Sequence, residues 1–207
     1  MAKQGYHHGN LPQALVEATL TLIAECGPQG FSMAEAAKQA GVSPAAPYRH
    51  FAGREMLIAE AARQGYEIFV TRMETAFDEG RPNPLAAFLA TGRAYLAFAR
   101  SNPGHYVAMF ESNLSVNASP GLSDAAGRAQ AVLTRAAAAL SAHLPPGRRP
   151  PAAMFAAHVW AMSHGVVELF ARGTPGARAP FPPEELLETG IGIYLRGLGL
   201  IPPDSAP

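Results

Sequence analysis

Apolar residues recur at three- and four-residue spacing along most of this chain, with polar residues between them. In the first stretch, Leu15, Ala18 and Leu22 fall on one face of a helix. Asn10 precedes the stretch and is a suitable N-cap, while glycine and proline follow it. The pattern therefore predicts an amphipathic helix over Leu11–Cys26.

Two short helical segments follow, joined by a glycine turn. Ser32 and Glu35 have the spacing of a capping box, in which each side chain bonds a backbone amide of the other at a helix start. A helix over Met33–Ala40 is expected, and Gly41 stands where a helix end needs a left-handed residue. A further helix is predicted over Pro44–Phe51.

Prolines and glycines divide the rest of the chain into segments of helical length. Alanine far outnumbers the β-branched residues, and hairpin dipeptides between alternating runs are not apparent. The fold class is therefore all-α, with about nine helices. The remaining six are expected at Arg54–Glu79, Leu85–Arg100, Pro103–Ser112, Leu122–Leu144, Ala152–Arg172 and Pro183–Leu198.

Composition excludes several classes of protein. The chain of 207 residues carries 16 basic and 16 acidic residues. Its formal net charge of zero therefore indicates neither a nucleic-acid nor an anionic-membrane partner. Cys26 is the single cysteine, which gives no intramolecular disulfide and no cysteine-based zinc site. The N-terminus does not read as a secretory signal, and no segment suits a bilayer. We expect a soluble, cytoplasmic protein without cofactor or metal.

The segment Phe31–Leu57 has the order of a helix-turn-helix, namely short helix, three-residue turn and second short helix. It resembles the TetR family of transcriptional repressors in Ala40-Gly41-Val42-Ser43, in Tyr48-Arg49-His50-Phe51 and in Arg54-Glu55-Met56-Leu57. The resemblance implies a three-helix DNA-binding domain over residues 1–55 and a helical effector-binding and dimerisation domain over residues 56–207.

The same resemblance assigns contacts with double-stranded DNA. It implies that Tyr48 and His50 bond phosphates and that Arg54 offers a cation to the backbone. The alternative for the first two is packing in a small core, and for Arg54 a solvated charge. Of the residues that could meet base edges, Arg49 has the strongest potential for guanine. The full candidate set is Ser32, Ser43, Pro44, Ala45, Tyr48, Arg49, His50 and Arg54.

Two features of the predicted DNA-binding domain depart from the family pattern. Pro47 replaces the usual aliphatic residue, so a distorted or 3₁₀-like start is an alternative to a regular second helix. The formal charges of Met1–Glu55 cancel, so we expect a shallow salt dependence of DNA binding. Lys3, His7 and His8 offer a minor-groove arm, although a terminus that merely flanks a helix cap explains them equally.

Near the C-terminus, Trp160, His164 and Gly165 form a W-x-x-x-H-G sequence that resembles the signature of WHG-type TetR C-terminal domains. Trp160 and His164 share a helix face, and Gly165 leaves room for another backbone. They are candidates for an effector pocket, the alternative being a buried tryptophan over a hydrogen-bonded core histidine. The candidate pocket residues are Phe88, Tyr95, Tyr106, Phe110, Trp160 and His164.

The last two predicted helices have little charge and a broad apolar side, so we expect a homodimer that binds a palindromic operator. The leading interpretation is a repressor released by a small, largely apolar effector. An enzyme is disfavoured because the chain lacks a phosphate loop, a nucleophile elbow and a zinc-protease motif. A helical ligand-binding or protein-interaction module without sequence-specific DNA binding remains the alternative.

Overall fold

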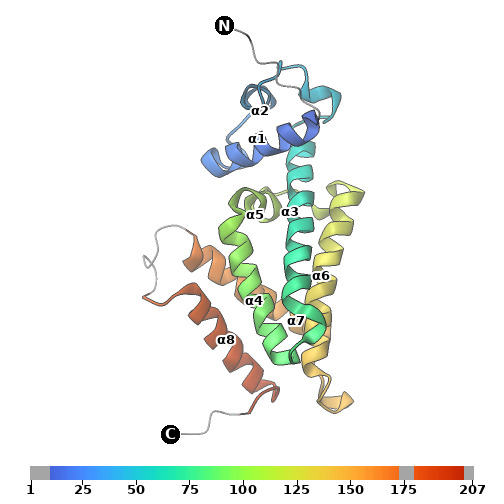
Figure 1. Ribbon diagram of the computed structural model, residues 1–207, viewed down its shortest axis with the longest axis vertical. Helices are drawn as coiled ribbons and strands as arrows, with labels where there is room; N and C mark the ends of the chain where they lie inside the picture. The colour runs from blue at the N-terminus through green and yellow to red at the C-terminus, as the bar shows by residue number, and fades with distance from the viewer. Residues whose placement is uncertain (1–9, 173–179, 203–207) are drawn as a thin grey trace. The chain divides into compact units, whose positions relative to one another are not determined.

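The computed structural model describes residues 10–172 and 180–202, which are helical and contain no strand (Figure 1). Three 3₁₀ turns lie in connections at Asp78–Gly80, Val116–Ala118 and Pro146–Arg148, and another, η1, at Pro47–Arg49. The main helices are α1 (Leu11–Cys26), α2 (Met33–Gln39), α3 (Arg54–Phe77), α4 (Pro84–Ser101), α5 (Pro103–Phe110), α6 (Pro120–Ser141), α7 (Ala152–Val166) and α8 (Pro183–Gly197).

The chain forms two compact units. The first contains residues 1–66 and 102–125, and the second contains residues 67–101 and 126–207. Helices α3 and α6 therefore contribute residues to both units. The predicted boundary between residues 55 and 56 separates a DNA-binding part from an effector-binding and dimerisation part. This division by role stays a prediction.

The all-α prediction is confirmed, and most helix bounds agree within a few residues. Helix α1 has the predicted bounds, and the Asn10 side chain accepts a hydrogen bond from the Gln13 amide at 3.4 Å. The capping box is also present, since the Ser32 hydroxyl accepts from the Glu35 amide and the Glu35 carboxylate accepts from the Ser32 amide. These helix starts depend on partners three residues apart, which explains why the sequence revealed them.

The predicted α-helix over Pro44–Phe51 is wrong. The Ser43 carbonyl accepts from the Ala46 amide, three residues ahead, at 3.0 Å. Pro47 has no amide proton to offer that carbonyl, so the four-residue bond of an α-helix cannot form there. A turn over residues 44–46 and the single 3₁₀ turn η1 take its place, which is the alternative that Pro47 raised.

The end of the predicted helix Ala152–Arg172 also differs. Near its end, Val167–Ala171 form a π-helix, closed by a bond from the Arg172 amide to the Val167 carbonyl at 3.1 Å. The close backbone approach expected at Gly165 is not seen in the described part of the chain, where an added Cβ would meet nothing within 4 Å. The glycine therefore does not serve packing within this region.

In the second unit, ion pairs connect neighbouring helices. Arg128 and Arg135 of α6 pair with Glu67 and Glu74 of α3, and Figure 1 shows these helices running side by side in the same direction. Helix α8 packs on α4 through Leu187 and Ile191, whose side chains lie near Gly92. In the core of this unit, the ring of Phe69 lies edge-on to the rings of Tyr95 and Phe98.

Candidate DNA-reading site

A fixed turn connects α2 to the segment that follows it. Gly41 has a φ of 72°, and its amide donates to the Lys38 carbonyl at 3.1 Å. The next amide, of Val42, donates to the Ala37 carbonyl at 2.9 Å. This pair of bonds is a Schellman motif, which needs the left-handed conformation that glycine adopts without strain. The turn thus sets the direction in which the chain leaves α2.

The segment after the turn presents its side chains to solvent. Tyr48 is 60% exposed, and Arg49 and His50 are exposed beside it. Pro47, which comes just before them, is buried and so fixes the turn to the protein. The exposure contradicts a core role for Tyr48 and His50. The smaller candidates on this surface, Ser43, Pro44 and Ala45, are exposed too.

Arg54, predicted to contact the DNA backbone or to be a solvated charge, is instead held by the protein. One guanidinium nitrogen, Nη1, donates to the carbonyls of Gln29 and Phe31, at 3.2 and 3.3 Å, and Nη2 donates to the Gln29 side chain. The guanidinium also lies 5.9 Å from the centre of the Phe31 ring. Arg54 therefore ties the start of α3 to the loop before α2, and a phosphate contact by it stays a prediction.

Ser32, also a candidate DNA contact, is exposed at the start of α2. Its hydroxyl both accepts from the Glu35 amide and donates to the Glu35 carboxylate at 2.7 Å. These bonds give the serine a structural role in the capping box. A DNA contact by Ser32 stays a prediction, as does an arm formed by Lys3, His7 and His8, which lie outside the described residues.

Replacing Ser32 with alanine is expected to destabilise the first unit by about 0.5–2 kcal/mol, the usual cost of losing an N-cap. The Ser32 hydroxyl and backbone amide lower the pKa of Glu35 by bonding its carboxylate. A pKa lowered on folding stabilises the fold above the unfolded-state value, and this contribution is lost as pH falls through the folded value. Urea unfolding from neutral to acid pH should therefore show a smaller acid-induced loss in Ser32→Ala, and an unchanged loss would contradict this.

Three of the candidate effector residues meet at one hydroxyl. The buried Tyr95 hydroxyl lies 3.0 Å from Nδ1 of His164 and accepts a hydrogen bond from Nε1 of Trp160 at 3.2 Å. The indole can only donate, so the Tyr95 hydroxyl is the acceptor of the Trp160 bond, whereas the direction of its bond with Nδ1 depends on the imidazole tautomer. This geometry joins α4 to α7, but Trp160 and His164 are only half-buried, so whether they belong to a pocket or to the core stays a prediction.

The other three candidates lie elsewhere. Phe88 stacks on Phe155 in the second unit, with ring centres 5.2 Å apart. Tyr106 and Phe110 belong to the first unit, where their ring centres are 4.9 Å apart. The six residues thus do not form a single cluster within either unit. Phe155, the partner of Phe88, was not among the residues predicted to line a pocket. Its position near the start of a helix with little charge could have indicated that it is buried.

Replacing Tyr95 with phenylalanine is expected to lower the free energy of unfolding by about 1–3 kcal/mol, since two hydrogen-bonded groups lose a buried partner. Trp160 is the only tryptophan in the chain, so its fluorescence reports directly on the loss during urea unfolding. Tyr194→Phe is the matched control, because the Tyr194 hydroxyl meets a single partner, the exposed His158, at 2.8 Å. Equal effects of the two substitutions would contradict a special role for the Tyr95 hydroxyl.

Within residues 10–172 and 180–202, no three His, Cys, Asp or Glu side chains are grouped so that they could hold a metal ion. No helix in these ranges has an apolar stretch long enough to cross a membrane. The exposed surface of η1, on its capped helix and glycine turn, is instead typical of a helix-turn-helix DNA-binding regulator.

Comparison with protein families supports this class. Residues 15–61 match the model for bacterial regulatory proteins of the tetR family, and residues 88–194 match the model for the tetracyclin repressor-like C-terminal domain. The second match alone spans more than half of the chain. The chain belongs to the TetR family of transcriptional regulators. Its assignment to the WHG type stays a prediction.

Individual relatives agree with the family. An uncharacterised HTH-type transcriptional regulator of Bacillus subtilis (strain 168), YobS, is 30% identical over 100 residues, which are 48% of this chain and 51% of that protein. The chain therefore matches about half the length of this relative. A Rhodococcus sp. RHA1 protein of unknown function superposes with a TM-score of 0.77 at 26% identity, covering 94% of this chain and 98% of the other. The TetR-family regulator PfmR of Thermus thermophilus shares the fold, with a TM-score of 0.65 and 22% identity over 88% and 97% of the two chains.

Proposed function

We propose that this protein is a cytoplasmic repressor that binds a palindromic operator as a homodimer and leaves it when a small, largely apolar effector binds. The observation that carries the proposal is the exposed Tyr48-Arg49-His50 surface, held on buried Pro47 after the Schellman turn. Tyr48 and His50 provide donors for phosphates, and Arg49 has the fork geometry that guanine accepts. Residues 1–55 would read DNA, and residues 56–207 would bind effector and partner.

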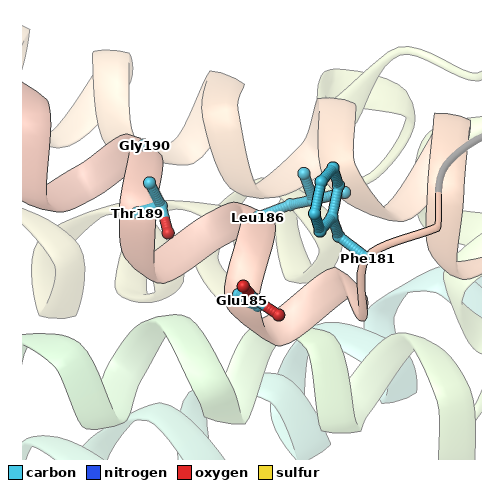
Figure 2. A pocket seen from close by; sticks show the side chains of 5 residues that line it. All are labelled: Phe181, Glu185, Leu186, Thr189 and Gly190. Atoms are coloured by element: carbon cyan, nitrogen blue, oxygen red, sulfur yellow. The ribbon is translucent and has the colours of Figure 1, made fainter.

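Exposed apolar side chains on α7 and α8 support the homodimer. Met154 is 59% exposed and Ile193 is 61% exposed, although both are large and apolar. Phe181, just before α8, is 53% exposed beside a hollow of about 190 Å³ that Leu186 and Gly190 also line (Figure 2). Because the opposite side of α8 is already buried, this outer face needs another partner, and a second copy provides one.

Release by an effector would be an allosteric coupling of typically about 1–3 kcal/mol between two sites. The support is compositional, since only 15% of residues are charged. The bonds among Tyr95, Trp160 and His164 favour a structural role for this cluster. An effector that reaches it would have to replace those bonds.

The proposal is tested by selecting random duplex DNA with the purified protein and sequencing the enriched pool. We expect a palindrome whose half-sites lie about 34–36 Å apart, or a multiple of that distance. Sedimentation should show twice the 21.7 kDa chain mass at micromolar concentration. A folded protein that enriches no sequence would instead support the interaction module without DNA reading, and a sedimenting monomer would overturn the homodimer.

A further inference from the structure

Pro47 gives this reading surface an unusual backbone. Three bonds span three residues each, from Ala46 to Ser43 at 3.0 Å, from Arg49 to Ala46 at 3.2 Å and from His50 to Pro47 at 3.0 Å, and a bond spanning four residues, from Phe51 to Pro47 at 2.9 Å, follows only after them. An α-helix would require the residue at position 47 to donate to the Ser43 carbonyl, and proline cannot donate. The start of this segment therefore departs from an α-helix because of one residue, Pro47, whose own side chain is buried.

The change in backbone moves Arg49. A 3₁₀ turn advances about 2.0 Å and 120° per residue, whereas an α-helix advances about 1.5 Å and 100°. Over the three residue steps from Ala46 to Arg49, the difference amounts to about 1.5 Å and 60°. Since base pairs are stacked about 3.4 Å apart, this displacement is enough to change which base edge the guanidinium meets.

Few other side chains in the segment can compensate. Pro44 and Ala45 are exposed but reach only a thymine methyl, and Ala46 is equally short. Tyr48 is long, yet it has a single hydroxyl rather than a bidentate fork. Base discrimination in each half-site therefore depends on where Arg49 points.

We infer that Pro47 is a specificity-determining residue, which fixes by its 3₁₀ turn the base pair that Arg49 reads without touching DNA itself. The inference rests on the proposed function, because it concerns the same reading surface. It assigns to the operator a short half-site in which one guanine, opposite Arg49, is specified most strongly.

The test repeats the selection of random duplex DNA with three full-length proteins, namely wild type, Pro47→Ala and Pro120→Ala. Pro120 is an exposed proline at the start of α6 and is not among the residues assigned to DNA contact, so it is the matched control. We expect wild type and Pro120→Ala to enrich the same half-site. Pro47→Ala should change the preference for guanine at the Arg49 position by at least about tenfold, within the range of one bidentate contact.

Each result has a definite meaning. Identical half-sites and discrimination for wild type and Pro47→Ala would overturn the inference and leave the proposed function intact. No enrichment by the wild type would overturn both. Because alanine leaves a gap at a buried position, Pro47→Val is selected in parallel, and circular dichroism checks that each variant melts as the wild type does. A folded variant at position 47 that retains the wild-type half-site would overturn the inference.

Discussion

Replacing Arg49 with alanine is expected to abolish sequence-specific DNA binding while leaving the fold intact. A bidentate contact with guanine contributes about 1–3 kcal/mol of discrimination, and a dimer on a palindrome makes that contact twice. The specific affinity should therefore fall by about 2–6 kcal/mol if the two half-sites add. Because Arg49 is exposed, its loss should not change urea unfolding. Fluorescence anisotropy with operator and scrambled duplexes measures the effect.

The comparison variant is His50→Ala, which removes an exposed neighbour expected to contact phosphate rather than base. Phosphate contacts position the protein but carry no sequence information directly. His50→Ala should thus weaken operator and scrambled binding alike, whereas Arg49→Ala should remove the difference between them. If Arg49→Ala keeps the wild-type ratio of the two affinities, base reading by Arg49 is excluded.

A large loss of stability is expected from Gly104→Ala. Helix α5 meets α1 at this residue so closely that an added Cβ would lie 2.7 Å from the Leu20 carbonyl oxygen and 3.3 Å from its carbonyl carbon. The obstacle is backbone rather than the end of a flexible side chain, so one helix must move. Overpacking of this kind costs about 1–3 kcal/mol and occasionally more. Urea unfolding followed by circular dichroism should show a lower midpoint.

Gly127→Ala on α6 provides the matched control, because an added Cβ there meets nothing within 4 Å. At an exposed position in a helix, alanine is favoured over glycine by about 0.5–1 kcal/mol. The two substitutions should therefore change stability in opposite directions. A gain in stability for both would show that α1 and α5 separate at little cost, contrary to the tight contact at Gly104.

The helices with clear local signals could be predicted from the sequence. Asn10, Ser32 and Gly41 each act on backbone groups within five residues, so their roles follow from spacing alone. The segment after the glycine turn was the exception among local features. A regular helix was predicted there over Pro44–Phe51, but Pro47 lacks the amide proton that such a helix needs.

The roles of the candidate site residues needed the tertiary structure. Arg54 has the position of a DNA-backbone cation in the sequence, but its partners, Gln29 and Phe31, lie more than twenty residues earlier. Tyr95 likewise meets Trp160 and His164, which lie 65 and 69 positions away in the sequence. No pattern of spacing identifies such partners, because they become neighbours only after the helices have packed.

The sequence by itself therefore determined the all-α class, most helix limits, the helix-turn-helix and the family. Each of these depends on periodicity, on a cap, or on residues close together in the chain. The tertiary structure decided which polar side chains are exposed to solvent and which, like Arg54, are bound within the protein. The physical reason is that burial and long-range hydrogen bonds are properties of packed surfaces, whereas capping and helical periodicity are properties of the local backbone.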